Sequence, residues 1–314
     1  FLWSPHSSYK HQTRLMMLVM PAEWQPHEAC LILYPHNAGV FRSENSKCDL
    51  ARAEFRNVAR AICNYGKENV CIFCNTQDEA DELRSLLQQE GDENTQSKDG
   101  ACRILVDVCK SDDSWCRDTG PTFVLSKQSK QLVGLDWDFN AYGGPEEGCY
   151  WPCDLDREVA GNMISALSRN YAPAMDMIRL KVDDLVLEGG SFHTDGEGTI
   201  LTTEECLLNP NRNPHLSRKQ IETIIKEKLG ASKVIWLPHG IAFDEDTNGH
   251  VDNIATFARP GEVVLSWTDD VDDVNYKIFK AAEDVLLEQL DAKGRKIKVH
   301  KIHVPDPLVS IALT

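Results

Sequence analysis

The sequence predicts an α/β fold of repeated units, an αβ propeller in which about four units are present. Three polar clusters, each holding a carboxylate, are each followed by two strand-like runs joined by a turn. The carboxylates that lead these repeats are Asp118, Glu188 and Asp252, separated by 70 and 64 residues. Equivalent strand ends converge on the axis of such a ring, so we expect these three side chains to lie together.

The amino-terminal unit alternates short apolar runs with helical patterns. We expect strands at 29–35, 69–74 and 102–108, with helices at 49–64 and 76–89 between them. Cys71 and Cys74 form a CxxC within the second of these strands. No second CxxC or paired histidine follows, so we interpret both thiols as buried strand residues and predict no metal site.

Each later unit begins with a polar cluster and continues into a hairpin. The clusters are at 114–120, 187–191 and 249–253, and the paired strands at 122–126 and 131–137, 192–194 and 199–205, and 255–258 and 262–267. Asp195-Gly196 and Pro260-Gly261 are strong turn signals between strands.

Two helices and two strands follow these hairpins. Ser217 and Gln220 fit a capping box, and Gly230 fits the end of the helix that they begin. We expect a strand at 233–237, a helix from Tyr276 to about Leu290, and a strand at 296–304.

Composition limits the classes of partner. The 314 residues carry a formal net charge of −16, which disfavours nucleic acid and acidic lipid and favours a cationic ligand. No apolar run approaches the roughly 18 residues that a membrane-spanning helix needs. The apolar stretch at 14–20 is too short for a signal peptide, and the cysteine count is odd, at eleven. We therefore expect free thiols and a cytoplasmic protein.

Residues 243–253 admit two interpretations. Asp244, Asp246, Asn248 and Gly249 match the first half of a calcium-binding EF-hand loop, but Ala255 stands where a bidentate glutamate is required. We therefore reject calcium. The alternative is a loop that presents His250 and Asp252 on one face of an extended chain.

The other two clusters also suit a planar cation. Glu188 precedes two glycines, which allow the backbone to approach a ligand closely. Trp115 lies three positions before Asp118, and an indole face beside a carboxylate attracts a guanidinium. A histidine nearby supplies a general acid–base. A nucleophile is missing from this set, although covalent catalysis is a common route at an unreactive carbon.

Five long segments closely resemble the agmatine deiminases, and the likeness runs from about residue 20 to residue 308. The segments are 20–29, 113–124, 134–144, 187–214 and 244–270. The resemblance implies a pentein fold, a five-bladed αβ propeller, and hydrolysis of agmatine to N-carbamoylputrescine and ammonia in polyamine biosynthesis. It implies a cysteine thiolate that forms a thiouronium adduct, no metal or organic cofactor, and a homodimer.

The resemblance also assigns roles by position. Asp118 and Asp252 are similar to the pair that binds the guanidinium nitrogens, and His250 resembles the general acid–base. Glu188 resembles the carboxylate that binds substrate and steadies this histidine. Trp115 resembles a wall of the substrate slot.

One departure concerns the nucleophile. The family's cysteine lies in a Gly-Gly-Asn-Ile-His-Cys-like stretch, and none of the eleven cysteines has that context. Cys116 lies nearest to a site motif, but we do not interpret it as a substitute.

We therefore expect residues 1–19 to be a non-homologous extension and 20–314 to be a pentein domain lacking its carboxyl-terminal blade, inactive as given. Two alternatives stay open. One is a catalytically dead protein that binds guanidinium compounds, and the other is a deiminase acting on arginine or peptidyl-arginine.

Overall fold

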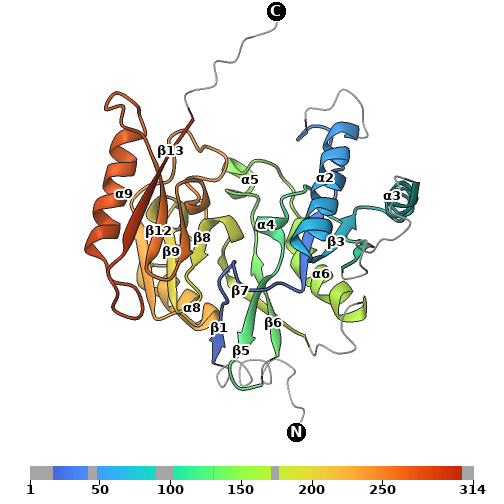
Figure 1. Ribbon diagram of the computed structural model, residues 1–314, viewed down its shortest axis with the longest axis horizontal. Helices are drawn as coiled ribbons and strands as arrows, with labels where there is room; N and C mark the ends of the chain where they lie inside the picture. Colours follow the sequence, from blue (N-terminus) through green and yellow to red (C-terminus); the bar gives the residue numbers. More distant parts are fainter. Residues whose placement is uncertain (1–16, 42–47, 90–101, 130, 171–176, 306–314) are drawn as a thin grey trace, which may run out of the picture.

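The computed structural model describes residues 17–41, 48–89, 102–129, 131–170 and 177–305. These residues form four small sheets that follow one another along the chain, from blue at the right of Figure 1 to red at the left. Helices α2 (Asp49–Ala61) and α3 (Gln77–Gln89) lie at one end and α9 (Tyr276–Glu288) at the other. Four sheets are compatible with the number of units expected from the sequence.

The first sheet is entirely parallel. Its strands are β2 (Ala29–Leu33), β3 (Asn69–Cys74) and β4 (Ile104–Val108), in the order β2-β3-β4. Helices α2 and α3 make the two crossovers, and a π-helical turn, η1 (Ile62–Gly66), extends α2. Cys71 and Cys74 are buried within β3, where the sequence placed them.

The other three sheets repeat one plan, an antiparallel hairpin followed by a helix and a parallel strand. The hairpins are β5 (Thr122–Ser126) with β6 (Leu132–Asp138), β8 (Phe192–Thr194) with β9 (Thr199–Thr203), and β11 (Ala255–Arg259) with β12 (Glu262–Trp267). The helices are α6 (Asp156–Asn170), α8 (Arg218–Leu229) and α9, and the parallel strands are β7 (Ile178–Val186), β10 (Lys233–Leu237) and β13 (Lys298–His303).

Local sequence explains where α8 begins and ends. The Gln220 side chain accepts a hydrogen bond from the Ser217 backbone N–H at 2.9 Å, which completes the predicted capping box. Gly230 ends the helix with φ +67°. A side chain there would also meet the backbone of Leu18, so the position requires glycine.

Several elements were missed from the sequence, among them the long strand β7. Strand β1 (Leu18–Val19) pairs with β5, and two residues are too few to show a period. Helix α6 is amphipathic, because residues 157, 158, 162, 165 and 169 are exposed on one side and apolar residues are buried on the other, so its pattern was available in the sequence. Short α7 (Glu204–Leu207) occupies positions where we expected β9 to continue. In the described part of the chain, no helix has the length and apolarity to cross a membrane.

Neighbouring sheets pack their apolar faces into shared cores. The second and third sheets share one core that includes Val133, Leu135 and Ile200. The third sheet also contributes Leu201, from the other face of β9, to the core beneath α9. Because neighbouring sheets share cores in this way, the loops at their ends keep fixed relative positions.

Candidate active site

The predicted site residues occupy one position in three successive repeats, immediately before a hairpin. Asp118 lies on α4 (Cys116–Thr119), which leads into β5. Glu188 precedes the 3-10 helix η2 (Gly189–Ser191) that leads into β8. His250 precedes the 3-10 helix η3 (Val251–Asn253), which carries Asp252 and leads into β11.

Gly190 shows how closely three of these side chains approach one another. A Cβ atom built on Gly190 would lie 2.6 Å from His250 Nδ1, 2.7 Å from Asp252 Oδ2 and 2.9 Å from Asp118 Oδ1. His250 Nδ1 and Asp118 Oδ1 are themselves 4.0 Å apart. The structure therefore brings Asp118, His250 and Asp252 together around a small space that only glycine leaves open.

Asp118 is held by two donors, one from a later loop of its own repeat and one from the next repeat. Its Oδ1 accepts the Gly190 N–H at 2.8 Å, and its Oδ2 accepts the Tyr142 hydroxyl at 3.0 Å. Burial raises the pKa of Asp118, and the positive charge of His250 opposes that rise. Burial also raises the pKa of Tyr142, so its phenol stays neutral and keeps the proton that it donates.

Glu188 is fully buried and paired with a cation that the sequence analysis missed. Arg212 Nε donates to Glu188 Oε1 at 2.6 Å, and both side chains are inaccessible to solvent. The remaining donors of this guanidinium bond to Asn211 Oδ1, Asn248 Oδ1, and the carbonyls of Tyr142 and Thr247. Arg212 thus ties Glu188 to the loop that carries His250.

The loop before His250 is shaped by Asp244. Its carboxylate accepts the backbone N–H groups of Gly249 at 3.1 Å and of His250 at 3.2 Å, and the Thr247 hydroxyl also donates to it. Asp244, which begins the calcium-like pattern, therefore acts here as an internal acceptor for a tight turn. The turn leaves His250 buried at the start of η3.

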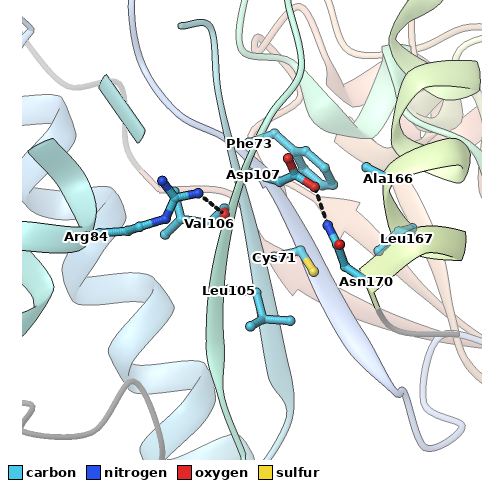
Figure 2. A pocket seen from close by; sticks show the side chains of 9 residues that line it. All are labelled: Cys71, Phe73, Arg84, Leu105, Val106, Asp107, Ala166, Leu167 and Asn170. Atoms are coloured by element: carbon cyan, nitrogen blue, oxygen red, sulfur yellow. Dashed lines mark hydrogen bonds between the residues drawn. The ribbon is translucent and has the colours of Figure 1, made fainter. Parts of the chain in front are cut away.

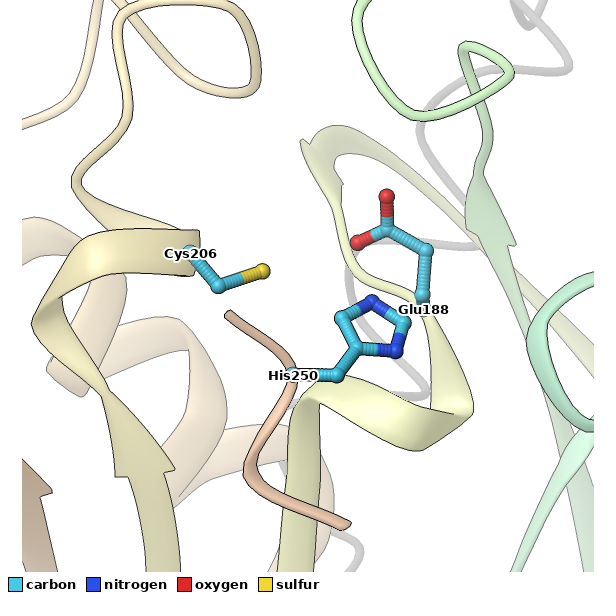
Figure 3. Close-up of side chains that lie close together, drawn as sticks. All are labelled: Glu188, Cys206 and His250. Carbon is cyan, nitrogen blue, oxygen red and sulfur yellow. The ribbon is translucent and has the colours of Figure 1, made fainter. Parts of the chain in front are cut away.

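Figure 3 shows what faces the second nitrogen of His250. Ligating atoms of Glu188, Cys206 and His250 all lie within 4.8 Å of one another, and all three residues are buried. Glu188 Oε2 and His250 Nε2 have no hydrogen-bond partner among the described residues. Cys206, on α7, was also missed from the sequence, because a thiol within an apolar stretch resembles any buried cysteine.

Trp115 lies at the edge of this group. Its carbonyl accepts the Asp118 N–H at 3.0 Å, so it caps the helix that positions that carboxylate. Its side chain is 52% exposed, which leaves the indole accessible to a ligand at the mouth of the site.

Two thiols lie near the group, and both are poor nucleophiles. Burial raises the pKa of Cys116 to about 12. Burial likewise raises the pKa of Cys206 well above its usual value, with the charge of Glu188 adding to the effect. Because the thiolate is the reactive form, neither sulfur is activated for attack at neutral pH.

A pocket of about 350 Å³ lies elsewhere, against β3, β4 and α6 (Figure 2). It is lined by Cys71, Phe73, Arg84, Leu105, Val106, Asp107, Ala166, Leu167 and Asn170. Arg84 donates to the Val106 carbonyl at 2.8 Å, and Asn170 donates to Asp107 at 2.5 Å. These polar groups therefore bond to one another within the pocket wall. None of the predicted site residues lines this pocket.

Successive hairpin units that present carboxylates and a histidine to one space define a pentein, the class of αβ proteins that modify guanidino groups. A sequence model of the Porphyromonas-type peptidyl-arginine deiminase family matches residues 19–312. Curated agmatine deiminases of Pseudomonas aeruginosa strain LESB58 and of Medicago truncatula are each 44% identical, covering 92% of this chain and 71% and 72% of their own lengths.

A solved structure gives the same result. The agmatine deiminase of Enterococcus faecalis superposes with a TM-score of 0.77 at 37% identity, covering 92% of this chain and 71% of that protein. The chain therefore belongs to the peptidyl-arginine deiminase family and, within it, to the agmatine deiminases, hydrolases of C–N bonds.

Proposed function

We propose that this protein hydrolyses agmatine to N-carbamoylputrescine and ammonia for putrescine synthesis. The observation that carries the proposal is the convergence of Asp118, Asp252 and His250 Nδ1 around the space over Gly190. Two carboxylates accept the paired N–H donors of a guanidinium, and a histidine beside them serves as general acid–base. The net charge of −16 favours approach of a cation.

Each residue has a role in the proposed reaction. Asp118 and Asp252 hold the guanidinium nitrogens, and the exposed indole of Trp115 covers the cation at the mouth of the slot. Glu188, anchored by Arg212, places a carboxylate on the opposite side of the His250 ring. Tyr142 and the Gly190 N–H keep the Asp118 carboxylate aimed at the ligand.

The chemistry proceeds in two stages. A cysteine thiolate adds to the guanidinium carbon, and ammonia leaves after taking a proton from His250, which forms the thiouronium adduct. A water molecule then adds as His250 removes one of its protons, and the C–S bond breaks to release the thiolate and N-carbamoylputrescine, whose remaining hydroxyl proton passes to solvent. We propose that this thiolate is none of the eleven cysteines, since the two that adjoin the site are protonated.

Calorimetry on this chain tests the guanidinium site. We expect agmatine to bind, and putrescine, which lacks the guanidinium, to bind far more weakly. Asp118→Asn and Asp252→Asn should each weaken agmatine binding at least about thirtyfold. Asp183→Asn, at a largely exposed position on β7, is the matched control and should bind as the parent does. Equal affinity in all variants would contradict the assignment of this site.

Ammonia release from the protein purified from its natural source tests the reaction. Release from agmatine supports the proposal, and faster release from arginine or an arginyl peptide would reassign the substrate. Agmatine binding without ammonia would instead identify a guanidinium-binding protein without catalysis.

We also propose a cytoplasmic homodimer. Eleven free cysteines suit a reducing compartment, and the dimer rests on the resemblance to the family. A monomeric mass by light scattering at micromolar concentration would contradict the dimer.

A further inference from the structure

Two buried polar atoms behind His250 have no bonding partner in the described structure. Glu188 Oε2 and His250 Nε2 face one another within the protein, and their residues are 0% and 2% exposed. Buried carboxylate and imidazole atoms are normally bonded, because leaving them unpaired forfeits their hydration. The Glu188 carboxylate and His250 Nε2 are on one side of the imidazole ring. His250 Nδ1 is on the other side, where it borders Asp118 and Asp252.

Cys206 completes this group from a third element. Its sulfur points toward the two unpaired atoms, and the ligating atoms of the three residues lie within 4.8 Å of one another (Figure 3). The Thr203 side chain accepts the Cys206 N–H at 3.2 Å and donates to the carbonyl of Gly249 at 2.6 Å. Because Gly249 adjoins His250, this threonine fixes α7 relative to the histidine.

The donor set matches a particular ion. Thiolate, imidazole and carboxylate are the three ligand types of zinc, and four-coordinate zinc places its ligand atoms about 3.5 Å apart. Movements of about an ångström would therefore close this group around an ion. Arg212 already holds Glu188 Oε1, which leaves Oε2 directed at the ion as a single oxygen ligand. Three protein ligands leave a fourth position for water.

We propose that Glu188, Cys206 and His250 bind Zn²⁺ and that the bound ion inhibits the enzyme. On binding, the Cys206 thiol releases its proton to solvent and the sulfur joins the metal as thiolate. His250 joins through Nε2, which keeps a proton on Nδ1, so the ring can no longer alternate between its cationic and neutral forms as general acid–base catalysis requires. This inhibitory consequence rests on the proposed role of His250, whereas the metal site itself does not.

The two nitrogens of His250 border different groups, and this predicts an unusual pattern of inhibition. Asp118 and Asp252 lie on the Nδ1 side, so the guanidinium site stays open when zinc occupies the Nε2 side. Zinc should therefore stop turnover while agmatine still binds in calorimetry. Loss of agmatine binding at saturating zinc would overturn the separation of these two sites.

Cobalt provides a direct readout of the sulfur ligand, independent of turnover. Titration of this chain with Co²⁺ should produce a sulfur-to-cobalt charge-transfer absorption at one equivalent, removed by an equimolar addition of Zn²⁺. Cys206→Ser should abolish this absorption, because serine supplies no sulfur. Cys149→Ser, which alters an exposed thiol outside the group, should retain it. Absorption that persists in Cys206→Ser, or vanishes in Cys149→Ser, would overturn the assignment.

Zinc-edge X-ray absorption tests the same site without any substitution. We expect one sulfur at about 2.3 Å and two or three lighter ligands. Two or more sulfur ligands would place the ion elsewhere, for example at Cys71 and Cys74, and would overturn the proposal. Because neither spectroscopic test depends on agmatine, failure here stays distinct from failure of the proposed function.

Discussion

Replacing Arg212 by Met removes the only charge that bonds directly to Glu188 within the described structure. Both side chains are fully buried, with Nε and Oε1 2.6 Å apart. Breaking a buried pair by removing one partner costs about 3–5 kcal/mol, because the remaining charge is left uncompensated. The carbonyls of Tyr142 and Thr247 also lose a donor, so we expect Arg212→Met to lower the free energy of unfolding by at least about 4 kcal/mol.

Urea unfolding of the parent, Arg212→Met, a double variant and a control isolates the contribution of the buried charge to the free energy of unfolding. The double variant Arg212→Met/Glu188→Gln should regain about half of the loss, because no buried charge is left unpaired. Arg157→Met is the matched control. Its guanidinium pairs with Asp138 at 2.8 Å but is 45% exposed, so the change should cost about 0–1 kcal/mol. A loss below about 1 kcal/mol for Arg212→Met would refute the view that this pair organises the site.

Three further predictions concern the site and its support. Gly190→Ala places a methyl group within 2.9 Å of three polar atoms and should weaken agmatine binding at least about tenfold in calorimetry; unchanged affinity would contradict the geometry. Tyr142→Phe removes the hydrogen bond to Asp118 and should weaken agmatine binding about threefold to tenfold, whereas tighter binding would exclude a positioning role. Burial raises the pKa of Asp156 from 3.8 to about 6. Its neutral form is therefore favoured in the fold, and as pH rises from 4 to 7 the protein should lose about 2 kcal/mol of unfolding free energy relative to Asp156→Asn. A difference between these two proteins that does not vary with pH would show that Asp156 is not shifted.

Turn chemistry made most of the fold predictable. Asp195-Gly196 and Pro260-Gly261 specify hairpins through local backbone preference alone, and both hairpins form where expected. Helix α8 was likewise bounded by its own capping residues. These signals are local, so they can be recognised in a sequence without knowledge of the tertiary contacts.

The convergence of the site also followed from the sequence, because Asp118, Glu188 and Asp252 recur at equivalent points of a repeat. Arg212 and Tyr142 could not be found in this way. Neither lies in the repeat position, and each reaches the site from the loop that follows the hairpin of its own unit. Nothing in a lone arginine between two asparagines reveals that its partner is a buried glutamate 24 residues earlier.

The hydrogen bond between Gly190 and Asp118 joins residues 72 positions apart, and the bond from Arg212 to Tyr142 spans 70. Closing such long loops costs chain entropy that only docked units can offset. Each hairpin can therefore form early from its own turn, whereas the site exists only after three units have assembled. In refolding experiments, secondary structure should return before agmatine binding does. Recovery of ligand binding would then report completion of the long-range fold rather than of any single unit.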